Sequence, residues 1–382
     1  SNSIADISAR SGCARSAPTS WLDCDSSATR LGIRLQMYAP KKLMRKKSMT
    51  NTITDLSDVS VDDLRSIQGT RLLLHVDQGS ARVAEWATEN HEHVERLLQA
   101  NGALLIRGLK FAGSQQFGVA LATLFGAELL EYVYRSTPRT QLRGNVYTAT
   151  EYHPSLQIPQ HNENAYGNRW AMRLGFLCTV PSEQGGATPI CNSELVYQQI
   201  PDAIRDRFER DGVMYVRNYS DIDVHWNDVF QTEEREEVER FCQANQISHE
   251  WLDGNRLRTR QINQASIRHP VTGAQVWFNQ AHLFHVSNLD EELQRNLLAS
   301  VGEADLPRNT YYGDGEPIAT SDLALIRNIY QRHAIRFDWQ RNDLLLLDNM
   351  LYSHGRDSFV GDRQVLVGMA RSIDADSVES RP

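Results

Sequence analysis

The sequence predicts an α+β, mainly β fold: a double-stranded β-helix, or jelly roll, flanked by helices. The first observation is a set of short apolar or alternating runs of strand length. The second is the near-helical spacing of apolar residues within 80–100, with further helices expected at 61–68 and 114–124. The predicted strands are 103–109, 172–180, 213–219, 275–279, 343–348 and 364–369.

The composition indicates one large folded domain. The chain has 382 residues, 41% of them hydrophobic, and a formal net charge of -8. We expect a single domain over 49–382 with a helical insert at 232–303. No apolar run approaches the length of a membrane span, and the acidic balance argues against nucleic acid as a partner. Five cysteines without a CxxC pair indicate reduced thiols and a cytoplasmic location. The sequence does not decide between a monomer and a homo-oligomer.

The first 48 residues differ in composition from the rest. They contain nine Lys or Arg, three Asp and no Glu, so they carry +6, and because the whole chain carries -8 the remainder carries -14. They are rich in Ser and Ala and lack hydrophobic periodicity, which favours a disordered extension and a natural start at Met49. A transit-type peptide is the alternative, because the segment is basic and poor in acids.

A His-X-Glu pair is the most informative motif. His161 and Glu163 stand two residues apart on a segment expected to be extended, so both side chains point to the same side. Much later, the apolar run 344–347 leads to His354. Two histidines and one carboxylate form the facial triad that binds Fe(II) and leaves positions open for a co-substrate and O2. Such a pair alone is more often a surface hydrogen-bonding couple, so the hypothesis depends on the residues that accompany it.

Two further residues support an iron site. Gly185 and Gly186 follow an apolar strand and predict a tight turn that delivers the Thr188 hydroxyl at the start of a strand. Arg363 lies shortly after His354, and a guanidinium matches the far carboxylate of a dicarboxylate bidentately.

In this order and spacing, the motifs resemble the TauD/TfdA (taurine dioxygenase, clavaminate synthase-like) family of Fe(II)/2-oxoglutarate-dependent oxygenases. The chain is most similar to its SyrP-type amino-acid hydroxylases, and the resemblance covers roughly residues 101–371. The segments that carry it are 161–163, 185–190, 212–219, 269–273, 276–280, 348–356 and 361–363.

The resemblance implies Fe(II), 2-oxoglutarate and O2 as cofactor and co-substrates, and a helical insert that covers the pocket as a lid. Because related halogenases lack the carboxylate ligand, its presence favours hydroxylation or desaturation. The implied iron ligands are His161, Glu163 and His354; the implied partners of the distal 2-oxoglutarate carboxylate are Thr188 and Arg363, with Arg371 as the alternative to Arg363; the implied substrate-side residues are Asn279, Gln280 and Arg217.

The resemblance also implies the reaction: hydroxylation of an amino acid in antibiotic biosynthesis, with release of succinate and CO2. The expected substrate is an aspartyl unit bound to a peptidyl carrier protein. One alternative is an oxygenase acting on a free amino acid or a betaine-like small molecule. An alternative of another class is a non-catalytic jelly-roll binding protein.

Several other polar residues are expected to have structural roles. His282 and His285 lack an accompanying carboxylate or cysteine, so packing or hydrogen bonding is expected for both. His269 is expected to be structural, and Asp348 and Asn349 are expected to order the loop that bears His354. Arg356 is expected to meet either a substrate carboxylate or the side chain of Asp357 or Asp362.

Overall fold

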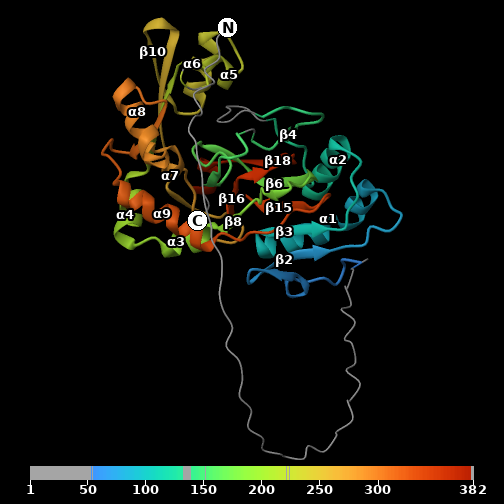
Figure 1. Cartoon of the computed structure of the whole chain (residues 1–382). Coiled ribbons are helices and arrows are strands. Elements are labelled where there is room, and N and C mark those ends of the chain that lie inside the picture. The colour runs from blue at the N-terminus through green and yellow to red at the C-terminus, as the bar shows by residue number, and fades with distance from the viewer. Residues whose placement is uncertain are drawn as a thin grey trace, which may run out of the picture. The chain divides into compact units, whose positions relative to one another are not determined.

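The computed structural model describes residue 53 and residues 55–131, 139–150, 152–220, 222 and 224–379 (Figure 1). The expected extension at 1–48 lies outside the described residues. The described helices are η1 (Val61–Asp63), α1 (Val83–Asn101), α2 (Ser114–Phe125), α3 (Ser193–Gln199), α4 (Asp202–Asp211), α5 (Trp226–Phe230), α6 (Arg235–Ala244), η2 (Asp253–Asn255), α7 (Ala281–Phe284), η3 (Val286–Asn288), α8 (Glu291–Val301), α9 (Thr320–His333) and α10 (Ala375–Glu379). The described strands are β1 (Arg65–Ile67), β2 (Thr70–His75), β3 (Ala103–Arg107), β4 (Val146–Thr148), β5 (Ile158–His161), β6 (Arg169–Val180), β7 (Gln184–Gly185), β8 (Ile190–Asn192), β9 (Val213–Tyr219), β10 (Ser248–Leu252), β11 (Arg256–Asn263), β12 (Ser266–Arg268), β13 (Gln275–Trp277), β14 (Arg308–Tyr312), β15 (Leu344–Asp348), β16 (Tyr352–Arg356), β17 (Phe359–Val360) and β18 (Gln364–Asp374).

Two sheets form the predicted jelly-roll core. The larger sheet has seven strands in the order β1-β2-β3-β15-β6-β18-β4, and the smaller has three in the order β5-β16-β8. The short strands β7 and β17 pair with each other; β7 precedes β8 in the chain and β17 follows β16. Strands far apart in sequence therefore become neighbours, which is how residues near 160, 188 and 354 come together.

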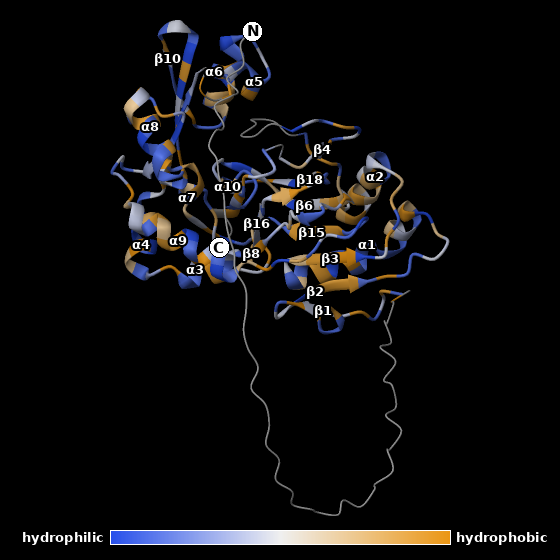
Figure 2. Cartoon of the chain, viewed as in Figure 1, coloured by the Kyte–Doolittle hydropathy of each residue, from blue (hydrophilic) through white to orange (hydrophobic). Residues whose placement is uncertain are grey.

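Strand β15 shows why the larger sheet has two apolar faces. Leu345 and Leu347 belong to the cluster between the sheets, whereas Leu344 and Leu346 belong to the cluster beneath the helices. Successive side chains on a strand point to opposite faces, so a run of four leucines fills both layers. Figure 2 shows the resulting concentration of hydrophobic residues in β3, β15 and β6.

Helices α1 and α2 cover the outer face of the larger sheet (Figure 1). Helix α2 comes very close to the sheet at Gly175 on β6 and Gly368 on β18, which are partners in the strand register. A Cβ atom at Gly175 would lie 2.3 Å from Leu121 Cδ1, and one at Gly368 would lie 2.6 Å from Leu121 Cδ2. The glycine pair therefore sets the distance between helix and sheet.

A second group of elements packs beside the jelly roll. Strands β10-β11-β9-β14 form a separate four-stranded sheet, which together with α3, α4 and α9 surrounds its own apolar cluster. Two expected core strands are therefore placed differently from the prediction: β9 belongs to this sheet, and β13 pairs only with β12. The insert at 232–303 is likewise a mixture, because it contains α6, α7 and α8 but also β10 to β13. The insert thus contains strands as well as helices, and one of these strands, β13, lies within the strand expected at 275–279.

The segment 61–68 was predicted to be helical and is not. A single 3-10 turn at Val61–Asp63 is followed by β1, which pairs with β2 in a hairpin. Gln68 and Gly69 connect the two strands and both have positive φ, 48° and 88°. Two consecutive residues of this kind make the turn that matches the twist of a hairpin, and this local geometry outweighs the helical propensity of the segment.

Candidate metal centre and co-substrate pocket

The smaller sheet brings the two histidines of the predicted triad together. His161 ends β5 and His354 lies in β16, and the two are direct partners in the strand register. Their ring centroids are 4.4 Å apart. Glu163 follows two residues after His161, and its Oε2 atom lies 3.8 Å from His354 Nε2. One potential ligand atom from each of the three residues lies within 4.8 Å of the others.

The chemistry of these donors fits a divalent iron ion. The His161 ring has its Nδ1 atom 2.9 Å from the Pro159 carbonyl oxygen, which can only accept, so Nδ1 carries the proton and Nε2 keeps its lone pair. Burial lowers the pKa of His161, although the neighbouring Glu163 opposes this shift. Burial, together with the charges of His161 and Arg139, places the pKa of His354 well below its usual value. Both rings are therefore neutral near pH 7, which is the state that binds metal.

The backbone of Glu163 is held by a buried amide. Asn349 Oδ1 accepts a hydrogen bond from the Glu163 N–H at 2.7 Å, while Asn349 Nδ2 donates to the Glu163 carbonyl at 2.9 Å and to the Ala171 carbonyl at 2.9 Å. Asn162 Nδ2 donates in turn to the Asn349 carbonyl at 2.6 Å. The two chain segments that bear the carboxylate and the distal histidine are thus joined directly, as expected of Asn349.

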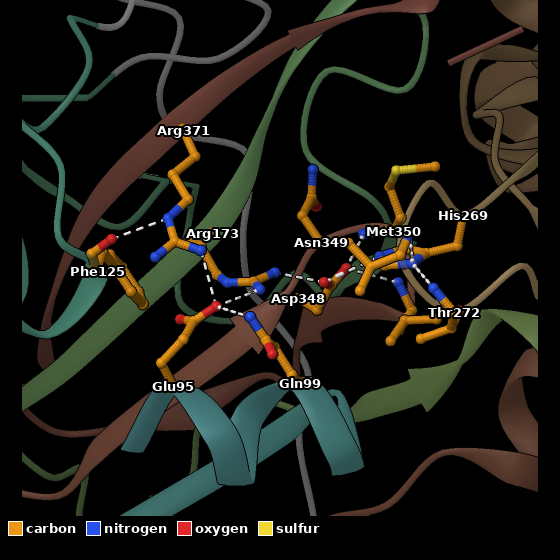
Figure 3. A network of polar contacts seen from close by, with 12 residues as sticks. Glu95, Gln99, Phe125, Arg173, His269, Thr272, Asp348, Asn349, Met350 and Arg371 are labelled. Carbon is orange, nitrogen blue, oxygen red and sulfur yellow. Dashed lines mark hydrogen bonds and ion pairs between the residues drawn. The ribbon is translucent and has the colours of Figure 1, made fainter. Parts of the chain in front are cut away.

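Asp348 is the centre of a buried charge network (Figure 3). Its carboxylate accepts hydrogen bonds from Arg173 and from His269 Nε2, the latter at 3.1 Å, and from the backbone N–H groups of Met350 and Leu351. Burial by itself would raise the pKa of Asp348, but the His269 hydrogen bond and the Arg173 charge outweigh it and lower the pKa. The network holds the turn between β15 and β16, so His269 and Asp348 have the structural roles expected of them.

The network continues to helix α1. Glu95 on α1 accepts from Arg173 Nη2 at 2.9 Å and from Arg371 Nη1 at 2.7 Å. Figure 3 shows Arg371 pointing toward Glu95 and the Phe125 carbonyl. Arg371 is therefore engaged on the helix side of the sheet, and Arg363 is the arginine that faces the pocket.

One pocket is lined both by the two histidines and by Thr188 and Arg363, the residues expected to hold 2-oxoglutarate. Arg363 Nη2 donates to Thr188 Oγ1 at 3.2 Å, and Arg363 Nε donates to the Gly186 carbonyl at 2.8 Å. Trp339 Nε1 also donates to Thr188 Oγ1, at 3.1 Å. Burial lowers the pKa of Arg363 to about 10, so the guanidinium stays charged at neutral pH. The lining residues are Arg139, Ala149, Thr150, Ile158, His161, Phe176, Thr188, His354, Gly355, Arg356, Arg363, Val365 and Val367.

The tight turn before Thr188 requires its glycine. Gly186 has a φ of 69°, and a Cβ atom there would lie 2.5 Å from Ser182 Oγ and 3.0 Å from the Arg363 side chain. A larger residue would displace Arg363 from the pocket. The Gly-Gly turn predicted from the sequence thus positions the guanidinium as well as the hydroxyl.

Arg139 is a site residue that the sequence analysis missed. Its Nη2 atom donates to Glu163 Oε2 at 2.7 Å, and both side chains are about 4% exposed. Arg139 belongs to no motif and precedes the short strand β4, so no sequence signal distinguishes it from other arginines.

The three expected substrate-side residues do not line this pocket. Asn279 donates to the Ala265 carbonyl at 2.6 Å, and Gln280 Nε2 donates to the Asn162 carbonyl at 2.7 Å, so both amides support the polypeptide backbone. Gln280 thereby steadies the loop between His161 and Glu163. Arg217 is buried on β9, with its guanidinium 4.7 Å from the centroid of the Tyr219 ring.

Arg356 lines the pocket but binds the backbone. Its guanidinium donates to the carbonyl groups of Tyr152, His153 and Leu156 at 2.7 to 2.9 Å. Neither of the expected carboxylates pairs with it, and Asp357 instead pairs with Arg336. The reason is geometric, because three carbonyl groups of the segment before β5 converge on one planar fork.

His282 is a buried histidine with a structural role, as expected. Its Nε2 atom donates to the Gln160 carbonyl at 2.9 Å, directly behind the strand that carries His161. Burial, opposed by the Gln160 hydrogen bond, lowers the pKa of His282 to about 4. The ring is neutral at pH 7.

We expect His282 to make the fold sensitive to acid. The pKa of His282 is about 4 in the folded state and 6.5 in the unfolded state. Between these pH values the unfolded chain therefore binds a proton that the folded chain does not bind. The free energy of unfolding therefore falls as the pH falls below 6.5, by up to about 1.4 kcal/mol per pH unit for this one group. Urea unfolding of the wild type and His282→Gln at pH 6.5 and pH 5 measures the effect. The wild type should lose about 1–2 kcal/mol more than the variant, and equal losses would contradict the assignment.

These observations define a class of protein: a jelly roll with a two-histidine, one-carboxylate centre beside an arginine-lined pocket, which is the arrangement of the non-haem iron oxygenases. The model of the taurine catabolism dioxygenase TauD, TfdA family matches residues 70–370. The chain therefore belongs to this family. It is a non-haem dioxygenase that depends on Fe(II) and uses 2-oxoglutarate and O2.

Two relatives of similar sequence agree with the family assignment. The dapdiamide synthesis protein DdaC of Enterobacter agglomerans is 39% identical over 281 residues, which are 73% of this chain and 85% of DdaC. A clavaminate synthase-like protein of Arabidopsis thaliana is 28% identical over 295 residues, 74% of this chain and 86% of that protein. The crystal structure of PvcB from Pseudomonas aeruginosa has a TM-score of 0.49 and 16% identity, and the match covers 82% of this chain and 92% of PvcB. In the part of the chain that the structure describes, no helix has the length and apolar character needed to cross a bilayer.

Proposed function

We propose that the chain hydroxylates an amino acid, an aspartyl unit carried as a thioester on a peptidyl carrier protein, in antibiotic biosynthesis. The observation that carries the proposal is the single pocket that His161, His354, Thr188 and Arg363 line together. The similarity to DdaC, whose name places it in dapdiamide synthesis, supports a biosynthetic setting. A cytoplasmic location is part of the proposal, and the three free, buried cysteines of the described chain are compatible with it.

The proposal gives each side chain a role that its position supports. His161, Glu163 and His354 would bind the iron, and the neutral rings and ionised carboxylate are the forms required for ligation. When bound, the iron together with 2-oxoglutarate and O2 supplies an oxidant able to cleave an unactivated C–H bond, one oxygen atom entering the product and the other entering succinate as CO2 leaves. Thr188 and Arg363 would hold the distal carboxylate of 2-oxoglutarate and so fix its orientation. Phe176, Val365 and Val367 give the same pocket an apolar wall.

Succinate release tests the proposed substrate. Purified protein with Fe(II) and ascorbate is offered aspartyl-loaded carrier protein or free L-aspartate, with 2-oxoglutarate in both reactions. The proposal expects hydroxylation and stoichiometric succinate only with the loaded carrier. Turnover of the free amino acid alone would favour the alternative of a free-substrate oxygenase.

Replacing Arg363 by Met should weaken 2-oxoglutarate binding by roughly 10- to 100-fold, because a charge-assisted hydrogen bond to a carboxylate contributes about 1.5–3 kcal/mol. Iron affinity should change little, since Arg363 contacts Thr188 and Gly186 rather than a ligand. Anaerobic equilibrium dialysis of 2-oxoglutarate measures the loss. The matched control is Arg341→Met, at an exposed arginine. Unchanged 2-oxoglutarate binding in the Arg363 variant would remove this residue from the co-substrate site.

A further inference from the structure

The Thr188 hydroxyl accepts two hydrogen bonds inside the pocket. Trp339 Nε1 donates to Thr188 Oγ1 at 3.1 Å, and Arg363 Nη2 donates to it at 3.2 Å. An indole N–H and a guanidinium are donors only, so neither group can accept the proton of the hydroxyl. Within the described part of the chain, no other group accepts that proton. Thr188 lines the pocket, so its hydroxyl keeps one donor for a bound molecule.

The turn that carries Trp339 is fixed by a buried ion pair. Arg107 and Asp343 make two hydrogen bonds, at 2.8 and 2.6 Å, and the Asp343 side chain is fully buried. The same pair holds the residues on either side of the tryptophan. The Asp338 carbonyl accepts from Arg107 Nη2 at 3.1 Å, and the Gln340 N–H donates to Asp343 Oδ2 at 2.7 Å. The backbone at Trp339 is therefore held independently of the pocket.

The ring of Trp339 is packed between the two sheets of the jelly roll. Trp339 is 8% exposed and belongs to the apolar cluster that fills this space. The Phe337 ring meets it edge-on, with ring centroids 5.0 Å apart and an angle of 74° between the ring planes. Backbone and ring are thus both fixed, so the indole N–H is already aimed at Thr188 before any ligand binds.

A carboxylate accepts hydrogen bonds and, when ionised, donates none. The proposed function, on which this step rests, assigns the distal carboxylate of 2-oxoglutarate to Thr188 and Arg363. We propose that Trp339 is a positioning residue for this co-substrate: together with Arg363 it occupies the lone pairs of Thr188 Oγ1, so that the hydroxyl proton is donated to the carboxylate. Without the indole N–H, the hydroxyl has a free lone pair and can rotate away from the carboxylate.

The consequence is selective for one end of the co-substrate. Trp339 acts through a hydroxyl that serves the distal carboxylate, so it contributes nothing to a 2-oxo acid that lacks this group. A tryptophan that only supported the shape of the pocket would affect both kinds of acid alike. The two roles therefore differ in a measurable way.

The test measures binding rather than turnover. Anaerobic equilibrium dialysis of the Fe(II)-loaded protein gives its affinity for 2-oxoglutarate and for 2-oxopentanoate, in which a methyl group replaces the distal carboxylate. Trp339→Phe should weaken 2-oxoglutarate binding by about 3- to 10-fold, the contribution of one neutral hydrogen bond, and change 2-oxopentanoate binding by less than about 2-fold. The matched control is Trp251→Phe, which also removes an indole N–H, one that donates to Glu239 at 2.8 Å outside the jelly roll. It should bind both acids as the wild type does.

A double-mutant cycle shows whether the indole acts through the hydroxyl. Thr188→Val keeps the shape of the side chain and removes the hydroxyl. In this background Trp339→Phe should weaken 2-oxoglutarate binding by less than about 2-fold further, because the group through which it acts is gone. If the Phe variant does not fold, 3-benzothienylalanine at position 339 replaces it, since this isostere keeps the ring and has sulfur in place of the N–H.

Each other result has a definite meaning. Equal weakening of both acids by Trp339→Phe, or single-variant losses that multiply in the double variant, would show that the ring acts by packing, and the proposal would be overturned. Unchanged 2-oxoglutarate binding in both substitutions at position 339 would overturn it as well, while the oxygenase assignment stands. If the wild type itself does not bind 2-oxoglutarate, the proposed function fails and this inference falls with it.

Discussion

Glu163→Ala should abolish iron binding and hydroxylation together. The variant removes one of the three proposed ligands and leaves two neutral imidazoles, which carry no charge to offset that of the ion. We expect iron affinity to fall by at least about 100-fold, because even the loss of a residue that only orients a ligand costs 10- to 100-fold. Metal content after anaerobic dialysis and succinate release under saturating 2-oxoglutarate are the two measurements.

A second variant separates ligation from folding. Glu163→Ala also leaves Arg139 without its buried carboxylate, so a loss of activity alone could reflect misfolding. Glu163→Gln retains an oxygen that can accept from Arg139 but lacks the charge of the ligand, and it should fold while still failing to hold iron. Glu128→Ala, at an exposed carboxylate, is the matched control. A folded Glu163→Gln protein with wild-type iron content and turnover would show that Glu163 is not a ligand.

Asp348→Ala should strongly destabilise the fold. Arg173, with a side chain 3% exposed, would lose a carboxylate that is itself 1% exposed, and His269 would lose its acceptor. Breaking a buried ion pair from one side costs about 3–5 kcal/mol, and Arg173 would keep only a carboxylate, Glu95, that it shares with Arg371. Chemical unfolding monitored by tryptophan fluorescence measures the loss.

The chain contains a matched exposed pair for comparison. Arg169 Nε lies 2.5 Å from Asp374 Oδ1, but these side chains are 65% and 52% exposed. Solvent screens such a pair, so Asp374→Ala should change the free energy of unfolding by less than about 1 kcal/mol. Similar losses in Asp348→Ala and Asp374→Ala would contradict a structural role for the network in Figure 3.

The sequence predicts the elements whose apolar pattern follows directly from their burial. Helix α1 buries one apolar face, and strands β15 and β18 are continuously apolar because both of their faces are covered, so each lies where its pattern places it. The strand expected at 213–219 is present as β9, but the sheet that it joins is not the one expected. Which sheet such a strand joins depends on partners such as β11 and β14, and its own residues do not encode them.

The residues of the candidate site also differ in whether the sequence reveals their roles. His161, Glu163 and His354 are recognisable because metal ligation demands particular residue types at particular spacings, and Thr188 and Arg363 because a turn and a guanidinium stand at the expected places. Asn279 and Gln280 have the right chemistry for a substrate site, yet backbone carbonyls take up their amide groups. Arg139 escapes prediction because its role comes only from the folding of its segment over Glu163.

The central claim is that three side chains and an arginine-lined pocket hold one iron ion and its co-substrate together. Anaerobic titration of the wild-type chain with Fe(II) in the presence of 2-oxoglutarate tests it most directly. We predict a visible charge-transfer band that saturates at one iron per chain and does not form when either component is omitted. Full binding of both components without such a band, or no binding of iron at all, would contradict the claim.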